Sequence, residues 1–277
     1  MPIVEGVCPK DFRSRIVPLG EPLVLRGVIR DWHAVTAWTP EGLEKRLGPI
    51  ELRFKYSRTH QHPNFLAGSK AEMFAVRPLL FRDFLHSVRH GPSSERANLL
   101  FMGDEQFVWR RRNGQIETNP ALLPLLEDIT LPECIPEQDL YTVWAWFSGK
   151  GVRTWLHYDD NGCHNINAQV QGSKRALLFP PTDLEHIPLF DASPSAAYNY
   201  SPLDIEALTA EQAAQLSKAH PWSAELEAGD VLFIPVHWLH TFEHLGDFNA
   251  NLNFWWKADP PVEDPIARRQ ARIEGRR

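Results

Sequence analysis

The sequence has few cysteines, no long apolar run and no large excess of charge of either sign. Among its 277 residues, Cys8, Cys134 and Cys163 lie far apart and without Cys-x-x-Cys spacing. A disulfide framework or a structural zinc site is therefore not expected. The 29 basic and 35 acidic residues give a net charge of −6, which argues against a protein that coats nucleic acid by bulk charge.

Marks of targeting are also missing. Residues 1–15 lack the charged-then-apolar pattern of a signal peptide, and no segment approaches the ~18 apolar residues that a membrane helix requires. We therefore expect a soluble, cytoplasmic protein without membrane contact.

Hydrophobic residues, histidine, tryptophan and proline are well represented. The chain is 43% hydrophobic and contains 12 histidines, 10 tryptophans and 23 prolines. Such a composition supports a substantial core. Frequent prolines and aromatic residues favour many short elements, which suits a mainly β fold better than a helical bundle.

Residues 1–138 mix strand and helix patterns and are expected to form an α+β extension that packs on a core. Strands are predicted at Pro22–Val28 and Ile50–Tyr56, and helices at Thr39–Gly48 and Phe81–Val88. Residues 102–138 show no regular pattern. Within them, Arg110, Arg111 and Arg112 precede the turn signal Asn113-Gly114, so this basic cluster is either a solvated hairpin tip or a contact for an anionic substrate.

Residues 139–258 form a succession of short strands that lacks regularly intervening helices. The predicted strands are Leu140–Phe147, Ile166–Val170, Ala176–Phe179, Trp222–Leu226, Val231–Val236 and Ala250–Trp256. One helix is expected after Thr209, which with Gln212 forms a capping box. Antiparallel strands in a jelly roll follow from this order. Residues 259–277 are then a charged tail.

One histidine and one carboxylate in the segment His157-Tyr158-Asp159 can converge on one metal ion. Residues two apart in a strand point to the same side, and His240 is the candidate third ligand. Two histidines and one carboxylate leave the open positions that non-haem iron(II) oxygenases use. The nearby His237 and His244 are alternatives by composition, and a strand running through residues 237–240 would place His237 and His240 on opposite faces.

The motifs of residues 154–256 resemble the JmjC-type cupin family with its double-stranded β-helix (cupin, jelly-roll) core. They are most similar to the branch with the asparaginyl hydroxylase of hypoxia-inducible factor and the wybutosine tRNA hydroxylase. The matching segments are His157-Tyr158-Asp159, Gln169-x-x-Gly172-x-Lys174-Arg175, Leu178-Phe179-x-Pro181, the run from Gly229 to His240, and Asn253-Phe254-Trp255. The resemblance implies that His157, Asp159 and His240 are the catalytic metal ligands.

The same resemblance implies Fe(II), 2-oxoglutarate as co-substrate, and O2. Lys174 would bind the distal carboxylate of 2-oxoglutarate, since a buried dianion requires a buried cation and hydrogen-bond donors. Spacing alone would instead place Lys174 on an outward-facing strand position. Thr154, Asn165 and Asn253 match family residues around the co-substrate and metal.

Two departures from the family pattern concern this pocket. A family tyrosine that contacts the distal carboxylate has no counterpart in Arg96–Phe101. Either Asn98 replaces it, or Lys174 and Thr154 bind that carboxylate alone. A two-residue insertion between Asp159 and Gly172 is predicted in the loop that contains Asn161–His164, close to the metal.

The resemblance implies an oxygenase that hydroxylates an unactivated C–H bond. A protein or peptide side chain is the preferred substrate, with Trp146, Trp155 and Arg110–Arg112 as candidate contacts. A modified tRNA base is the alternative. Members of the family often form homodimers, which stays open here. A non-catalytic metal-binding cupin module, or a zinc or manganese isomerase, is the alternative of another class.

Overall fold

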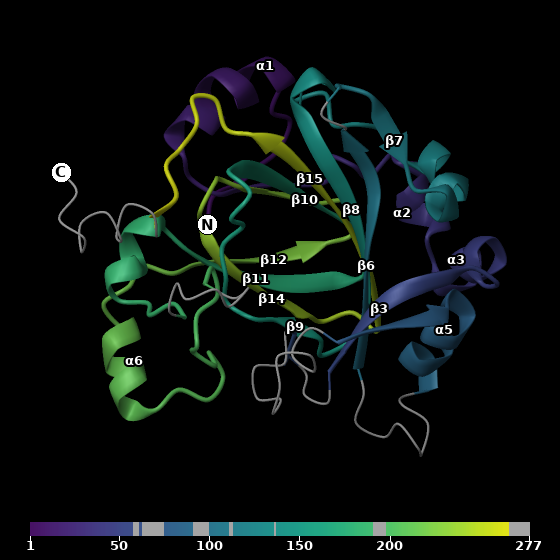
Figure 1. Ribbon diagram of the computed structural model, residues 1–277. Coiled ribbons are helices and arrows are strands. Elements are labelled where there is room, and N and C mark those ends of the chain that lie inside the picture. Colours follow the sequence, from purple (N-terminus) through teal and green to yellow (C-terminus); the bar gives the residue numbers. More distant parts are fainter. Residues whose placement is uncertain are drawn as a thin grey trace.

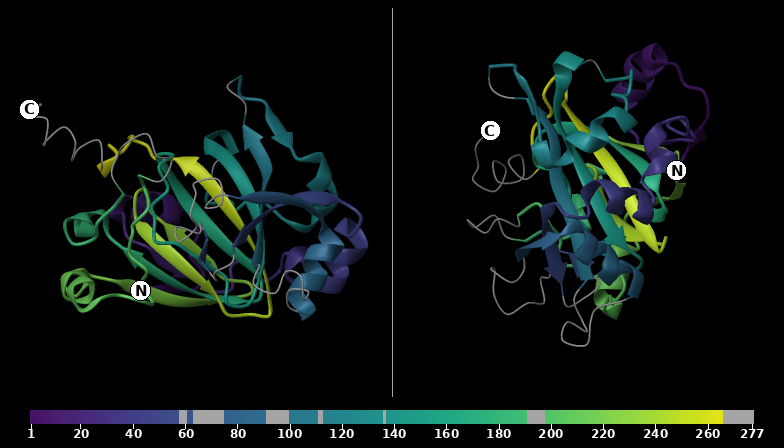
Figure 2. Two further views of the ribbon diagram at one scale, coloured as in Figure 1. Left: turned by 60° about the horizontal axis from the view of Figure 1, so that its bottom comes forward. Right: turned by 90° about the vertical axis from the view of Figure 1, so that its right-hand side faces the viewer.

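A computed structural model of the chain describes residues 1–57, 61–62, 75–90, 100–110, 113–135, 137–190 and 198–265. Two β-sheets lie face to face and enclose an interior, with helices outside them (Figures 1 and 2). Neighbouring strands are antiparallel, except that β1 (Ile3–Val4) is parallel to β2 (Leu23–Leu25) and β4 (Gln61–His62) is parallel to β9 (Arg153–Thr154). In the described residues the larger sheet has ten strands, in the order β1 (Ile3–Val4), β2 (Leu23–Leu25), β13 (Val231–Ile234), β10 (Cys163–Gln171), β15 (Phe248–Lys257), β8 (Leu140–Gly149), β6 (Leu100–Arg110), β3 (Glu51–Ser57) and β5 (Val76–Leu80), with β7 (Ile116–Thr118) beside β6. The smaller sheet has five, β12 (Trp222–Glu227), β11 (Ser173–Phe179), β14 (Leu239–His244), β9 (Arg153–Thr154) and β4 (Gln61–His62). This arrangement is the predicted mainly β, jelly-roll type of fold.

Alternation along the central strands separates an apolar outer face from a polar inner face. On β8, Val143, Ala145 and Phe147 belong to the main hydrophobic cluster beneath the helices, whereas Trp144 and Ser148 point to the opposite side because successive side chains alternate. The inner face of the larger sheet therefore carries polar groups that face the smaller sheet.

Helices lie on both sides of the sheets. The helical segments are α1 (Pro9–Asp11), η1 (Phe12–Ile16), η2 (Val17–Leu19), α2 (His33–Ala37), α3 (Pro40–Leu47), α5 (Phe81–His90), η4 (Pro120–Asp128), η5 (Glu137–Asp139), η6 (Pro181–Glu185) and α6 (Ala210–Leu216). Helices α2, α3 and α5 gather on the side opposite α6 (Figure 1). Both predicted N-caps are confirmed: the Thr39 hydroxyl accepts from Gly42 N at 3.1 Å, and Thr209 and Gln212 form the capping box.

The expectation of irregular structure over residues 102–138 is wrong. This stretch contributes most of the 11-residue strand β6, strand β7 and helix η4. Strand β6 contains Gly103, Asp104 and Glu105, which are poor strand formers, but it pairs with both β3 and β8. Strand propensity depends strongly on such neighbours. The predicted hairpin tip is confirmed: β6 ends at Arg110, and Asn113 accepts from Gln115 N at 3.0 Å before β7 begins.

Two further boundaries differ from the prediction. Strand β13 ends at Ile234, and a turn leads into β14, which the sequence pattern did not reveal. The predicted loop Asn161–His164 is half strand, because Cys163 and His164 begin β10.

None of the helices in the described residues has both the length and the apolar character needed to cross a bilayer.

Candidate metal centre

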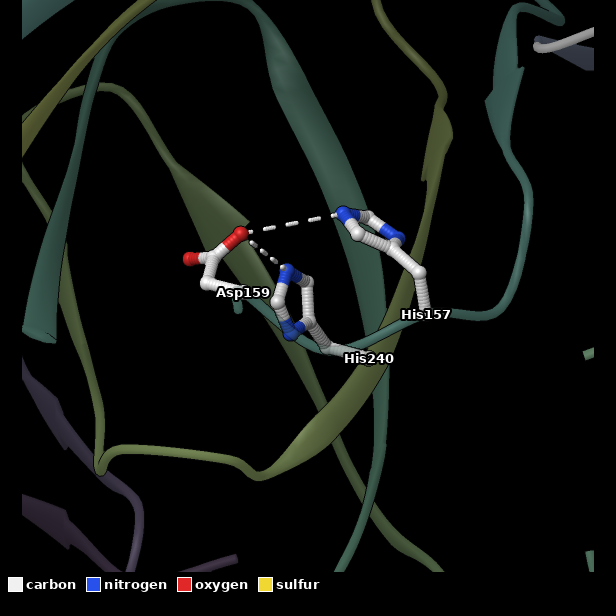
Figure 3. Close-up of side chains that lie close together, drawn as sticks. All are labelled: His157, Asp159 and His240. Carbon is white, nitrogen blue, oxygen red and sulfur yellow. Dashed lines mark ion pairs between the residues drawn. The ribbon is translucent and has the colours of Figure 1, made fainter. Parts of the chain in front are cut away.

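Three side chains with metal-binding atoms converge at one end of the interior. Asp159 Oδ1 lies 3.9 Å from His157 Nε2 and 4.0 Å from His240 Nε2, and the three groups point toward one another (Figure 3). Two bonds of about 2 Å, the usual length from a transition metal to nitrogen or oxygen, span up to about 4 Å. One ion can therefore contact all three groups.

The backbone holds the two histidines opposite each other. His157 N donates to His240 O at 3.1 Å, and His240 N donates to His157 O at 2.6 Å. This reciprocal antiparallel bridge brings the side chains of directly opposed residues to the same face. The ring centroids are consequently 4.4 Å apart.

Each imidazole is oriented by a backbone carbonyl two residues earlier. His157 Nδ1 lies 2.7 Å from Trp155 O, and His240 Nδ1 lies 3.0 Å from Trp238 O. A carbonyl only accepts, so Nδ1 carries the proton and Nε2 presents its lone pair to the centre. Tyr200 also stacks on the His157 ring at 4.8 Å. These contacts give both rings the tautomer that a metal ligand requires.

The carboxylate of Asp159 is held by one oxygen and free to bind through the other. Its Oδ2 accepts from Trp255 Nε1 at 2.8 Å and from Asn165 Nδ2 at 3.2 Å. Burial, followed by the repulsion of His240, lowers the pKa of His157 to about 4. Two imidazole nitrogens and one carboxylate oxygen form a donor set that fits a divalent ion such as iron(II).

Contrary to the prediction from strand alternation, His237 and His240 do not lie on opposite faces of one strand. His237 lies in the turn between β13 and β14 with a φ of 63°, so no strand connects it with His240. Its ring packs edge-on against Tyr158 at 5.7 Å. His237 is not a member of the converging group, and the geometry, not the face of a strand, separates it from His240.

Lys174 points into the interior and is 1% exposed. Its Nζ donates to Asn167 Oδ1 at 2.5 Å and lies 4.5 Å from the centre of the Phe242 ring. Burial lowers the pKa of Lys174 well below its usual range. Among the described residues no carboxylate forms an ion pair with Lys174. An anion bound beside Lys174 would favour its charged ammonium form, so this position suits the distal carboxylate of 2-oxoglutarate.

The other predicted co-substrate residues occupy different surroundings. Asn165 and Asn253 are buried on the inner faces of β10 and β15, and Asn253 Nδ2 donates to Asn165 Oδ1 at 3.1 Å. Thr154 Oγ1 accepts from Phe242 N at 2.9 Å, and Thr154 also lines a groove outside the smaller sheet. Asn98, the candidate replacement for the tyrosine, lies outside the described residues.

The predicted substrate contacts are separated in space. Trp155 is 4% exposed, and its Nε1 donates to Ser201 O at 2.5 Å. Its indole is therefore part of the buried packing. Trp146 is partly exposed, and Lys55 Nζ lies 5.1 Å from the centre of its ring. Arg110 ends β6, and the two arginines after it lie outside the described residues.

Sequence reasoning missed several residues of the interior. Asn167 contacts Lys174, Trp255 contacts Asp159, and Ser148 hydrogen-bonds His244. A pattern was available for the first of these. Asn165, Asn167 and Gln169 alternate with apolar residues, as expected for a strand with a polar inner face.

Comparison with known proteins gives the family. A sequence profile of the cupin-like domain matches residues 9–261. The tRNA wybutosine-synthesizing protein 5 of Gallus gallus is 29% identical over 265 residues, which cover 94% of this chain and 78% of that protein. Lysine-specific demethylase 8 of Xenopus tropicalis is 26% identical over 264 residues, 90% of this chain and 51% of that protein. The chain thus spans about half of that demethylase. It belongs to the cupin-like, JmjC-type family and is an iron(II)- and 2-oxoglutarate-dependent oxygenase.

Proposed function

We propose that the protein binds Fe(II) through His157 Nε2, Asp159 Oδ1 and His240 Nε2, and hydroxylates an unactivated C–H bond of a macromolecular substrate. The observation that carries this proposal is the orientation of the three groups. Both Nδ1 atoms and Asp159 Oδ2 are engaged by the protein, which leaves one ligand atom of each residue for the metal.

Bound iron together with 2-oxoglutarate and O2 supplies the oxidising chemistry for such a C–H bond. The chain contributes binding, orientation and exclusion of water. The carbonyls of Trp155 and Trp238 hold the proton of each imidazole on Nδ1 and so leave Nε2 unprotonated. Asn165 and Trp255 fix the orientation of the Asp159 carboxylate.

The co-substrate pocket is proposed to lie between the metal centre and Lys174. Strand register supports this position: on β14, His240 and His244 point to the same side, and Lys174 pairs with His244. The pocket therefore extends along the inner face from the metal to the lysine. Asn165 and Asn253 lie on the opposite wall. The Thr154 hydroxyl accepts from Phe242 N, and its own O–H is the donor it would offer to the ligand.

A groove on the inner face of the larger sheet is the proposed substrate surface. Its volume is about 900 Å³ including open solvent, and it is lined by Arg53, Lys55, Val76, Glu105, Gln106, Trp109, Asn119 and Trp144. Trp144 pairs with Asn253 on β15, so the groove adjoins the barrel interior. Trp146 is not among the residues that line this groove, and its Nε1 is buried without a hydrogen-bond partner among the described residues.

We propose a protein or peptide side chain as the substrate. The groove combines indole rings, cations and the carboxylate of Glu105, which suits a polypeptide of mixed charge better than a uniformly anionic backbone. A modified tRNA base is the second candidate, and the similarity to a tRNA wybutosine-synthesizing protein over 94% of the chain favours it. Trp109 and Trp144 are rings on which a base could stack.

Succinate formation tests the activity. Purified protein with iron(II), ascorbate, O2 and 2-oxoglutarate should form succinate, and His157→Ala or zinc in place of iron should reduce this to background. Equal turnover with zinc, or full turnover in His157→Ala, would contradict the proposal and favour a non-catalytic or isomerase cupin.

The substrate needs a separate measurement. Peptides and tRNA from the source cells, treated with wild-type protein or with His157→Ala, are compared by mass spectrometry for the mass of one added oxygen atom. Oxidation of tRNA alone, with salt-sensitive binding that is lost when Arg110, Arg111 and Arg112 are neutralised, would replace the protein substrate by RNA.

A further inference from the structure

Four buried asparagines form a row on the inner face of the larger sheet. Asn165 and Asn167 belong to β10, and Asn251 and Asn253 belong to β15; their exposed fractions lie between 2% and 6%. Asn167 pairs directly with Asn253. Their neighbours on the same strands, such as Ile166 and Leu252, face the apolar outer cluster. Four amides in a barrel interior are costly unless their donors and acceptors are satisfied.

Three of these amides join Lys174 to Asp159 in one unbroken series of hydrogen bonds. Lys174 Nζ donates to Asn167 Oδ1 at 2.5 Å, and Asn167 Nδ2 donates to Asn253 Oδ1 at 3.2 Å. Asn253 Nδ2 donates to Asn165 Oδ1 at 3.1 Å, and Asn165 Nδ2 donates to Asp159 Oδ2 at 3.2 Å. Each amide uses its oxygen toward the lysine and its nitrogen toward the carboxylate.

The chemistry of the carboxylate end fixes this direction. An ionised carboxylate has only acceptors, so the nitrogen of Asn165 must face Asp159. Each following amide then presents its oxygen to the nitrogen of the one before it or to the amino group of Lys174. Amide orientation is often ambiguous. Here, rotating any single amide by 180° places two donors or two acceptors face to face. Asn251 Nδ2 donates to the same Asn253 oxygen at 2.7 Å and supports this orientation.

We propose that this series, hereafter the amide relay (Asn167, Asn253 and Asn165), couples the lysine to the metal ligand, and that Asn167 is a positioning residue for Asp159. The inference rests on the proposed function. Asn167 reaches Asp159 only through the two other amides, so it acts on the carboxylate without touching it. An anion at Lys174 and a metal at Asp159 would then bind cooperatively, because both stabilise the same orientation of the amides.

A purely structural role makes a different prediction. If the amides only satisfied one another, replacing any of them would lower stability without a specific effect on metal binding. Gln169 offers a matched control. It lies on the same face of β10, is 0% exposed, and donates to Gln171 O and Asn249 Oδ1, outside the relay.

The test is an anaerobic titration of the full-length protein with cobalt(II), followed by its visible absorption, alone and with 2-oxoglutarate. Asn165→Leu should weaken cobalt binding about 10- to 100-fold, as is typical when the partner of a metal ligand is removed. Asn167→Leu should weaken it about 3- to 10-fold and change the absorption spectrum. The double variant should bind cobalt no more weakly than Asn165→Leu, since both changes break one series. Gln169→Leu should lower the melting temperature but leave cobalt affinity within about twofold of wild type.

Asn167→Asp keeps the shape of the residue and serves if Asn167→Leu does not fold. It retains an acceptor for Lys174 but presents an acceptor to Asn253 Oδ1. Both cobalt and 2-oxoglutarate should then bind about 10-fold or more weakly than to wild type, because the introduced carboxylate also forms an ion pair with Lys174. Wild-type cobalt affinity and spectrum in the folded Asn167 variants, or additive losses in the double variant, would overturn the relay while leaving the proposed function intact. Failure of the wild type to bind cobalt would overturn both.

Discussion

Two aspartates in this protein receive similar donors but differ in what neutralises them. Asp128, at the end of η4, accepts from Trp38 Nε1 at 2.8 Å, from His33 Nδ1 at 2.7 Å and from the guanidinium of Arg46. Burial alone would raise its pKa, but the hydrogen bonds from Arg46, His33 and Trp38 outweigh burial and lower it. This carboxylate ties α2, α3 and η4 together.

Asp159 also accepts an indole N–H, from Trp255, but its second donor is the neutral amide of Asn165. Among the described residues, neither lysine nor arginine forms an ion pair with it. Its other oxygen, Oδ1, faces the Nε2 atoms of His157 and His240, whose protons lie on Nδ1. Hence the charge of Asp128 is compensated within the fold, whereas that of Asp159 is left for a cation from solution. The difference predicts stability effects at one residue and binding effects at the other.

The largest effect is expected for Asp159→Asn. The amide can replace neither the charge nor both acceptors of the carboxylate, so iron-dependent succinate formation should fall to the level measured without iron. The unfolding free energy of the metal-free protein should change by less than about 1 kcal/mol, since no internal ion pair is lost. Urea denaturation and the succinate assay measure the two quantities. A large loss of stability with retained turnover would reverse the comparison.

Lys174→Met is the next in size. The apparent KM for 2-oxoglutarate should rise about 10-fold or more because the distal carboxylate loses its cation. The metal-free protein should be as stable as wild type or more stable, since replacing a buried ionisable side chain by an apolar one of similar length is often neutral or stabilising. An unchanged KM would show that the co-substrate does not reach Lys174.

Asp128→Asn should show the opposite pattern. Loss of the partner of Arg46 should lower the unfolding free energy by about 2–4 kcal/mol, while the kcat of the folded protein at low temperature stays within about twofold. Denaturant unfolding and steady-state kinetics provide the check. A substantial loss of kcat without loss of stability would mean that the Asp128 cluster acts on the metal centre.

The pH dependence of the unfolding free energy adds to the comparison of Asp128 with Asp159, and the change expected per pH unit is the smallest of these effects. Burial, followed by His237, lowers the pKa of His164 to about 4, and burial, followed by Lys174, lowers that of His244 to about 3. In the unfolded chain both histidines bind protons below the ordinary pKa of 6.5, whereas in the folded chain they stay neutral until the pH approaches their lowered pKa. Stability should therefore fall by about 1 kcal/mol per pH unit for each histidine as the pH decreases from 6.5 toward 4.

Asp128 should act in a separate and lower pH window. Its pKa is lowered in the folded state, so its contribution is present above 3.8 and is lost as the pH falls further. Urea titrations of the metal-free protein at successive pH values should show a loss below 6.5 in both wild type and Asp128→Asn. The additional loss below pH 4 should occur in wild type alone. A flat profile between pH 6.5 and 4 would contradict the histidine contribution.

Much of the fold was predictable because local patterns agree with their surroundings. Alternation along Leu140–Gly149 and the capping box at Thr209 each follow from a rule that tertiary contacts do not override. Strand β6 was not predictable, because its Gly-Asp-Glu segment becomes a strand only through pairing on both sides.

The metal centre shows the same division. His157 and Asp159 are two residues apart, so their proximity follows from sequence. The approach of His240 depends on a backbone bridge between chain segments 83 positions apart in numbering. The turn that separates His237 from His240 depends on a positive φ that no residue pattern there signals. Asn167 could be placed on a polar face from its spacing, but its contact with Lys174 depends on how the two sheets that contain β10 and β11 face each other.

A crystal structure grown without oxygen in the presence of iron(II) and 2-oxoglutarate, with anomalous data collected at the iron edge, tests the central claim most directly. The account predicts one iron peak bonded to His157 Nε2, His240 Nε2 and Asp159 Oδ1, with the distal carboxylate of 2-oxoglutarate on Lys174 Nζ. An iron peak at other residues, or 2-oxoglutarate bound away from Lys174, would contradict it.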